Sequence, residues 1–319
     1  MERRTFLGLM GAGLAGTGLA GRVSAEGESV IRGPVKVDLG HSLADPFCIF
    51  WQGAWYITGT HHGARGGVNG LLYDMYRSSD LLSWTHLGGI LVRPDYEGSG
   101  QANYWAPEIL PHGGKFYLYY TADSNGDNYR RYVRLGIADQ IEGPYLDQGV
   151  KLTEQTSIDA NPNWFGQSGW MFYTGNEGND NVGQVMVDRM NSPARTAGEP
   201  RRAFPDETVP WEEGAFLVPH EGKYYLFTSM GNWRDGTYRV MLSVADRPEG
   251  PFERLMDGEK PLVILSSHGD CLGPGHNSVF EGPGGRPYIC YHAWDPRHTG
   301  RYPWIAPLSF DSTRFIVEL

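Results

Sequence analysis

Three carboxylates, Asp45, Asp159 and Glu213, could do chemistry, because each one opens an apolar segment of the chain. Asp45 occurs in Ala-Asp-Pro, Asp159 in Ile-Asp-Ala and Glu213 in Glu-Gly-Ala. Carboxylates that converge in a folded chain repel one another, so their convergence usually serves a task. Two separated carboxylates can divide general acid and base catalysis, one activating water and the other protonating a leaving group. Glycoside hydrolysis needs such a pair.

The elements that must position these residues form a repeat. Five segments share a turn followed by an aromatic-rich strand, with equivalent positions taken as Tyr56, Tyr117, Met171, Tyr225 and Tyr288. The spacings between these positions are 61, 54, 54 and 63 residues. Each unit has room for about four short strands, the make-up of a propeller blade. The repeat predicts an all-β chain folded as a five-bladed β-propeller, in preference to a tandem β-sandwich or an ordinary barrel.

The first strand of each predicted blade would line a central channel. Counting back 12 residues from the equivalent positions, or 11 in the first unit, reaches Asp45, Trp105, Asp159, Glu213 and His276. Each of these residues has an ordinary structural explanation when it is taken singly, such as an Asp-Pro turn or a core Trp. Their shared register favours a ring of functional side chains at the mouth of the channel.

Composition limits the partners. The 319 residues include 44 Gly, 10 Trp, 18 Tyr and 13 Phe, which suits strands joined by tight turns. The net charge of −10 argues against nucleic acid as a partner. Beyond the N-terminus no apolar stretch approaches the ~18 residues of a membrane span. The three cysteines, Cys48, Cys271 and Cys290, allow one disulfide and one thiol or three buried thiols, and the oligomeric state stays open.

The N-terminus has the pattern of an export signal. Arg3-Arg4 is followed by a Gly-rich, weakly apolar run and by the small residues Val23-Ser24-Ala25. This order resembles a bacterial twin-arginine signal. We therefore expect a signal peptide over residues 1–25, a short linker over 26–34, a catalytic domain over 35–319, and export to the periplasm or the extracellular space.

Several motifs together resemble glycoside hydrolase family 43, from about residue 35 to the end of the chain. Besides the three carboxylates, they are Trp105-Ala-Pro-Glu108, Gly-His276-Asn-Ser, Tyr291-His-Ala, Gly300-Arg301 and Ala306-Pro-Leu308. The resemblance implies a five-bladed propeller that inverts the anomeric centre. It also implies a carbohydrate substrate, typically an α-L-arabinofuranoside, a β-D-xyloside or an arabinan.

The resemblance also implies roles for individual residues. Asp45 would be the general base, Glu213 the general acid, and Asp159 the residue that modulates and orients the acid. His276 would lie near a hydrated calcium, with water between them, and Arg301 would reach the sugar. Trp105 offers a flat face for a sugar ring, which Trp294, Tyr104 and Trp304 could extend. An inverting enzyme would separate the carboxyls of Asp45 and Glu213 by ~6.5–9.5 Å.

Two rival functions stay open at this stage. One is a carbohydrate-binding propeller that kept the pocket without the chemistry, and the other is a retaining propeller enzyme acting on fructosides. The second expects an opening Asn-Asp-Pro-Asn motif, which is missing. No cofactor is required. The Asp123-Ser-Asn-Gly-Asp127 segment fails the EF-hand pattern, and no group of His or Cys has zinc spacing along the chain.

Overall fold

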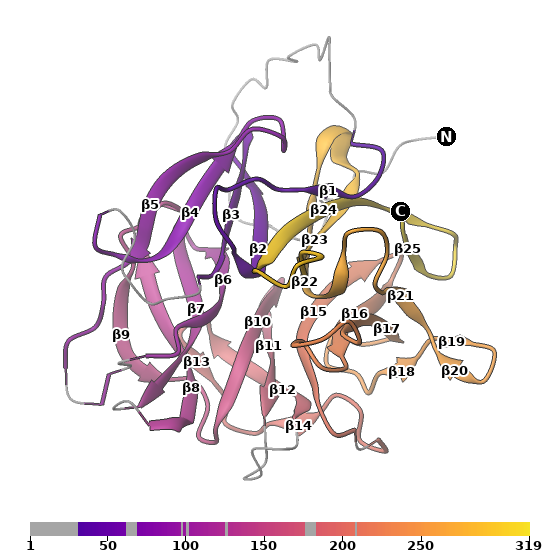
Figure 1. Ribbon diagram of the computed structural model, residues 1–319. Coiled ribbons are helices and arrows are strands. Elements are labelled where there is room, and N and C mark those ends of the chain that lie inside the picture. Colours follow the sequence, from indigo (N-terminus) through magenta and orange to yellow (C-terminus); the bar gives the residue numbers. More distant parts are fainter. Residues whose placement is uncertain are drawn as a thin grey trace, which may run out of the picture.

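Within the part of the chain that the structure describes, five antiparallel sheets of four or five strands are arranged around a central axis, besides one two-stranded hairpin (Figure 1). The computed structural model describes residues 31–319, except 62–68, 97, 100–101, 125–126, 176–182 and 208. Its regular elements are strands and one short 3-10 turn, Pro283–Gly285. The prediction of an all-β, five-bladed propeller is confirmed. The predicted signal peptide, residues 1–25, lies outside the described residues.

The blades follow one another along the chain, each beginning at its innermost strand. Blade one contains β2 (Ala44–Trp51), β3 (Ala54–Thr60), β4 (Leu72–Ser78) and β5 (Thr85–Leu91). Blade two contains β6 (Trp105–His112), β7 (Lys115–Ser124), β8 (Asp127–Ala138) and β9 (Leu146–Lys151). Blade three contains β10 (Ser157–Phe165), β11 (Ser168–Gly175) and β12 (Gln184–Ser192), and both β13 (Arg195–Thr196) and β14 (Arg201–Arg202) pair with β12.

Blades four and five have three inner strands arranged as in the other blades, but their outer edges differ. Blade four contains β15 (Glu212–His220), β16 (Lys223–Met230) and β17 (Arg239–Ala245), with β18 (Glu253–Arg254) and β21 (Val263–Leu265) both paired to β17. A small hairpin, β19 (Met256–Asp257) and β20 (Lys260–Pro261), lies between those two edge strands in sequence. Blade five contains β22 (Leu272–Glu281), β23 (Pro287–Trp294), β24 (Arg301–Phe310) and β25 (Phe315–Val317).

The ring is closed by a strand from the other end of the chain. β1 (Val35–Lys36) pairs with β24 in antiparallel register, with Val35 opposite Ile305. β25 also pairs with β24, with Leu308 opposite Val317. Both ends of the described chain are therefore fastened to blade five, which is visible in Figure 1 where β1 crosses beside β24. The repeat count alone did not predict this closure.

The repeated aromatic strands form the packing between blades. Tyr56, Phe116, Tyr225 and Tyr291 are buried in one apolar cluster that runs through several blades. Tyr104 belongs to the same cluster and stacks on Tyr120, and Trp304 packs partly buried against it. The proposal that Tyr104 and Trp304 extend the sugar face was therefore wrong, because both contribute to the core.

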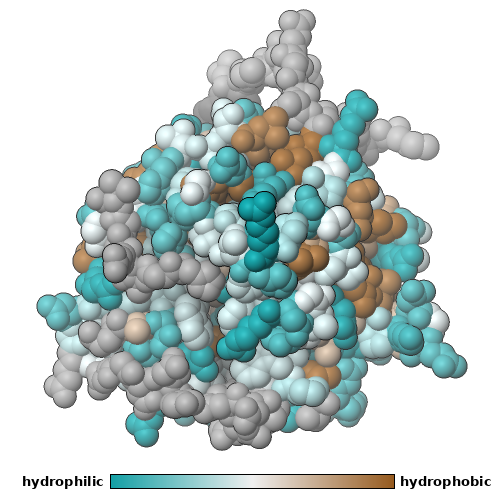
Figure 2. All heavy atoms as spheres, viewed as in Figure 1, coloured by the Kyte–Doolittle hydropathy of each residue, from teal (hydrophilic) through white to brown (hydrophobic). Residues whose placement is uncertain are grey.

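The three cysteines form no disulfide. Cys48, Cys271 and Cys290 are all buried free thiols, which selects the second of the two cysteine alternatives. Figure 2 shows that hydrophobic atoms on this face form separate patches among polar ones. No helix among the described residues is long and apolar enough to cross a membrane.

A β-bulge near the start of each innermost strand turns the chain toward the axis. In every blade the register shifts there, and a residue with positive φ occupies the bulge: Asp45 (48°), Ala106 (44°), Asp159 (61°), Gly214 (59°) and His276 (47°). L-residues adopt this conformation at a cost, and such strain gathers at functional sites. Asp45, Asp159 and His276 therefore share one strained position.

The sequence count placed Trp105 and Glu213 at that same position, and this was wrong by one residue. Both stand immediately before the bulge residue, at the last paired position before the bulge near the start of their strand. Trp170, and not Met171, pairs as Tyr56 does, and the first hairpin of blade five is one residue longer than the others. The count of 12 therefore reached the bulge residue in blades three and five, and it went one residue too far in blades two and four. The local twist of a bulge still directs side chains from both positions into the same cavity.

Candidate active site

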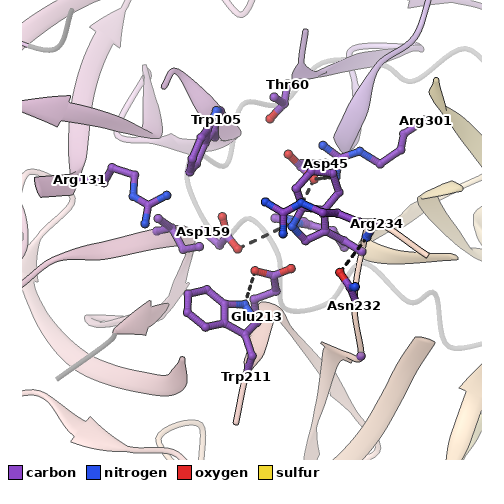
Figure 3. A pocket seen from close by; sticks show the side chains of 14 residues that line it. Asp45, Thr60, Trp105, Arg131, Asp159, Trp211, Glu213, Asn232, Arg234 and Arg301 are labelled. Carbon is purple, nitrogen blue, oxygen red and sulfur yellow. Dashed lines mark hydrogen bonds and ion pairs between the residues drawn. The ribbon is translucent and has the colours of Figure 1, made fainter. Parts of the chain in front are cut away.

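A cavity of about 590 Å³ opens at the end of the channel where the inner strands begin (Figure 3). This volume falls in the range of small-molecule sites, ~300–1,000 Å³. Six of the nine residues singled out from the sequence line it: Asp45, Trp105, Asp159, Glu213, His276 and Arg301. The other lining residues are Thr60, Arg131, Ile158, Trp211, Gly231, Asn232, Trp233 and Arg234. Trp294 is not among them.

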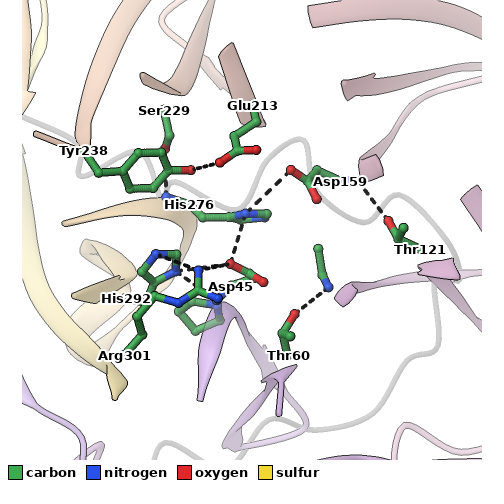
Figure 4. Close-up of polar contacts among 12 residues, drawn as sticks. Asp45, Thr60, Thr121, Asp159, Glu213, Ser229, Tyr238, His276, His292 and Arg301 are labelled. Atoms are coloured by element: carbon green, nitrogen blue, oxygen red, sulfur yellow. Dashed lines mark hydrogen bonds and ion pairs between the residues drawn. The ribbon is translucent and has the colours of Figure 1, made fainter. Parts of the chain in front are cut away.

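Asp45, on β2, is surrounded by nitrogen atoms (Figure 4). Its Oδ1 lies 3.2 Å from His292 Nδ1, 3.4 Å from His276 Nδ1 and 3.5 Å from an Arg301 guanidinium nitrogen. Its backbone N–H donates to His292 Nδ1 at 3.0 Å. Burial alone would raise the pKa of Asp45, but His276, Arg301 and His292 together hold it well below its usual value. Asp45 is therefore ionised and able to accept a proton.

Asp159, on β10, has the opposite environment. It is only 6% exposed, and its backbone N–H donates to Thr121 Oγ1 at 3.1 Å. Burial, followed by repulsion from Glu213 and Asp45, raises its pKa well above the usual value. Two carboxyls of the same cavity thus have pKa values pushed apart by their surroundings, which is the pattern of a site that separates acid and base roles.

Glu213, on β15, is held by two hydrogen bonds from neighbouring aromatic residues. The Tyr238 hydroxyl donates to Oε1 at 2.7 Å, and the Trp211 indole N–H donates to Oε2 at 2.6 Å. Gly214 follows at the bulge, where a Cβ would lie 3.1–3.2 Å from atoms of His276. A side chain there would require His276 to shift by a few tenths of an ångström, and the positive φ of 59° also favours glycine.

His276, on β22, lies between two of the acids. Its Nδ1 is 3.4 Å from Asp45 Oδ1 and 3.8 Å from Asp159 Oδ2, and its backbone N–H donates to Ser229 Oγ at 2.7 Å. The next residue, Asn277, has a buried side-chain amide with no hydrogen-bond partner among the described residues. One amide oxygen falls short of the six to eight oxygen ligands that calcium prefers. The calcium near His276 stays a prediction.

His292, on β23, supports Asp45 from behind. It is almost fully buried, and burial, with the nearby charge of Arg301, lowers its pKa to about 4. His292 is therefore neutral near neutral pH. Its Nε2 lies 3.4 Å from Arg301, so one ring connects the carboxylate and the guanidinium.

Two indole rings provide apolar surface in the cavity. The Arg131 guanidinium lies 4.9 Å from the centre of the Trp105 ring, and that of Arg301 lies 4.4 Å from the centre of the Trp233 ring. Trp294 stacks on Trp233 with ring centres 6.5 Å apart and planes 7° apart, and its Nε1–H donates to Trp233 O at 2.6 Å. Trp294 is therefore a support of the lining residue Trp233, and its contact with a saccharide stays a prediction.

Sequence reasoning missed several residues of this site. They are Thr60, Arg131, Trp211, Trp233, Arg234, Tyr238 and His292. Trp211 comes from the connection before β15, and Trp233 and Arg234 come from the β16–β17 connection, neither of which belongs to the repeated strands. Only His292 had a signal, since it falls within the Tyr291-His-Ala motif.

Comparison with known proteins agrees with this geometry. The family model described as glycosyl hydrolases family 43 matches residues 36–313. A β-D-galactofuranosidase of Aspergillus niger is 28% identical over 270 residues, which cover 78% of this chain and 73% of that protein. An extracellular endo-α-(1→5)-L-arabinanase of Bacillus subtilis is 23% identical, covering 80% of this chain and 65% of its own. The crystal structure of a thermostable family-43 glycoside hydrolase superposes with a TM-score of 0.74 at 26% identity, covering 86% of this chain and 92% of the other.

Proposed function

Because the chain belongs to the glycosyl hydrolases of family 43, which are inverting enzymes, we propose that it hydrolyses arabinan- or xylan-type saccharides with Asp45 as base and Glu213 as acid. The observation that carries the proposal is the set of three carboxyls from blades one, three and four in a single cavity. Asp159 and Glu213 are buried, and the Asp45 side chain is 11% exposed. They differ in environment, since the pKa of Asp45 is lowered and that of Asp159 is raised.

The proposed reaction is a single displacement. Asp45 takes a proton from water, the water oxygen bonds to the anomeric carbon from one face, and the glycosidic C–O bond breaks on the other. Glu213 gives a proton to the departing oxygen. Burial and repulsion from Glu213 raise the pKa of Asp159, which would keep a proton on a carboxyl close to the acid. Tyr238 and Trp211 keep the Glu213 carboxyl oriented.

The substrate class is supported by the cavity walls and by the relatives. Trp105 and Trp233 supply flat apolar faces, and sugar rings stack their C–H surfaces on such faces. Two of the relatives are named for acting on furanosides, arabinan in one and a galactofuranoside in the other. We therefore rank α-L-arabinofuranosyl bonds first and β-D-xylosyl bonds second.

Export forms part of the same proposal. The Bacillus subtilis relative is named as extracellular. The twin-arginine pattern of residues 1–25 is the feature of this chain that points the same way. A fusion of residues 1–34 to a reporter, compared with the Arg3→Lys, Arg4→Lys double variant, tests it. Loss of reporter export in the variant supports the pathway, and equal export contradicts it.

Hydrolysis is tested with aryl α-L-arabinofuranosides, β-D-xylosides and β-D-galactofuranosides, and with linear arabinan. Proton NMR of the first-formed sugar should show the inverted anomer. Asp45→Asn and Glu213→Gln should each lower kcat by ~10²–10⁴-fold on substrates with poor leaving groups. Asp139→Asn, an exposed carboxylate paired with Lys115, serves as the matched control.

Each contrary outcome has a distinct meaning. A retained anomer would rule out the single displacement. Saccharide binding by calorimetry without turnover of any substrate would favour the carbohydrate-binding propeller. Full activity in both Asp45→Asn and Glu213→Gln would remove the assigned roles even if the chain is a hydrolase.

A further inference from the structure

Blade one brings together three metal-ligating side chains that are far apart in the sequence. Ligand atoms of His41, His61 and Asp74 all lie within 4.8 Å of one another. His41 precedes β2, His61 follows β3, and Asp74 lies within β4. None of the three lines the active-site cavity. The cluster is therefore separate from the proposed chemistry.

His41 has a tautomer that leaves one ring nitrogen available as a ligand. Its Nδ1 lies 2.9 Å from Ser42 O, and a carbonyl oxygen can only accept, so Nδ1 carries the proton and donates. Nε2 then has a free lone pair, which faces the Tyr76 hydroxyl. A backbone carbonyl that fixes one nitrogen of a histidine is the usual companion of metal ligation by the other.

Asp74 is a buried carboxylate with an incompletely satisfied oxygen. The residue is 8% exposed, and its Oδ1 receives no well-aligned hydrogen bond from the described residues. Asp74 Oδ1 lies 3.1 Å from His86 Nε2, and the His86 ring stacks on Tyr76 with centres 4.7 Å apart. A buried carboxylate oxygen in this state costs free energy that a cation would offset.

From these contacts we propose that His41 Nε2, a ring nitrogen of His61 and an Asp74 oxygen bind one zinc-type divalent cation, with water as the fourth ligand. Two imidazoles and one carboxylate suit zinc, whereas calcium and magnesium prefer all-oxygen sites. His86 would hold Asp74 from outside the ligand set. The Tyr76 hydroxyl, which occupies His41 Nε2 in the metal-free protein, would be displaced.

The position of this site gives the metal a structural role. His41 lies four residues before Asp45, and His61 directly follows Thr60, which lines the cavity and accepts a hydrogen bond from the Ala106 backbone N–H at 2.8 Å. A metal here would fasten the segment that leads into β2 to β3 and β4. These strands lie side by side in blade one (Figure 1).

The binding experiment uses the full chain without an affinity tag, after treatment with a chelator. Titration with zinc chloride in a calorimeter should show one saturable site, and calcium or magnesium chloride should show none there. Cobalt(II) should give the strong visible absorption of a tetrahedral site. His61→Gln and Asp74→Asn should each weaken zinc binding at least tenfold and remove that absorption. His112→Gln, at the boundary of blades two and three, should bind as the wild type does.

Tyr76→Phe tests the ligand set by the sign of its effect. Removing the hydroxyl frees His41 Nε2, so zinc should bind more tightly than to the wild type. Weaker binding by Tyr76→Phe would overturn the ligand set. Absence of a one-to-one site, or equal binding by the wild type and His61→Gln, would overturn the site itself. Neither result bears on glycoside hydrolysis.

Discussion

Tyr238 offers a sharp test of how the proposed acid works. Its hydroxyl donates to Glu213 Oε1 at 2.7 Å, the side chain is only 1% exposed, and it does not line the cavity. Burial, together with the nearby Glu213 charge, raises the pKa of Tyr238 well above its usual value, so the hydroxyl stays protonated and donates. Tyr238→Phe removes that hydrogen bond while keeping the ring, which stacks on His292 with planes 9° apart.

The expected size of the effect follows from this contact. A hydrogen bond to a charged group contributes about 1.5–3 kcal/mol, and each 1.36 kcal/mol of barrier is tenfold in rate, so kcat should fall by roughly 13- to 160-fold. The upper value applies if the whole bond is needed in the transition state. Trp211 still holds Oε2, which favours the lower half of the range. KM should change little because Tyr238 does not line the cavity.

The assay compares two leaving groups on the same sugar. The alcohol of an alkyl glycoside needs proton donation to depart, whereas 2,4-dinitrophenolate departs from its glycoside without it. The kcat loss of Tyr238→Phe should be large for the first and nearly absent for the second. Tyr145→Phe is the matched control, because its buried hydroxyl donates to the Ile141 carbonyl at 3.0 Å, away from the cavity.

Two results would refute the reasoning. If Tyr238→Phe loses the same factor on both leaving groups, the hydroxyl does not act through proton donation by Glu213. If its kcat matches that of Tyr145→Phe on the poor leaving group, the hydrogen bond has no part in the reaction.

Three further predictions concern the same channel. Arg301→Gln removes one of the charges that lower the pKa of Asp45, so the acidic limb of kcat/KM against pH should move to higher pH, and an unmoved limb would argue against Asp45 as the base. Burial raises the pKa of Glu108 well above its usual value, against the effect of its hydrogen bond from Asn161. Its protonated form therefore stabilises the fold below the unfolded-state pKa of about 4.3, and this stability is lost as pH rises toward the folded-state pKa. Glu108→Gln should accordingly gain thermal stability over the wild type as pH rises from about 5 to about 8, and a shrinking difference in melting temperature would contradict this. Trp105→Ala should raise KM by roughly 2- to 13-fold, the equivalent of the ~0.5–1.5 kcal/mol of an aromatic contact, with kcat nearly constant. An unchanged KM in steady-state kinetics would remove Trp105 from the sugar site.

Much of this protein was predictable from local pattern. Each blade repeats the same hairpin of turn and aromatic strand, so counting along the chain found five units and the strand on which each acid lies. Asp45, Asp159 and His276 were found at their true bulge positions in this way. Sequence periodicity works here because strand pairing within a blade is local and repeats the same register.

Other features depended on contacts between blades. Trp105 and Glu213 precede the bulge by one residue, a shift that hydrogen-bond register reveals and side-chain pattern does not. Trp233 and Trp211 come from connections between strands, whose sequences do not repeat from blade to blade, so the repeat could not point to them. Trp294 is a residue type that suits stacking on a sugar ring, but its indole stacks on that of Trp233.

The sequence by itself therefore determined the five-part ring and the acids that open its inner strands, because both follow from short-range alternation and turn chemistry. Only the tertiary structure decided the electrostatic environment of each acid. Asp45 lies beside His276, His292 and Arg301, which lower its pKa, while Asp159 is buried near Glu213 and Asp45, which raise its pKa. It alone also joined β1 to β24 and brought His41, His61 and Asp74 together. Closure of the ring brings β1 to β24 from opposite ends of the described chain, and strand pairing within blade one brings the three ligand-type side chains together.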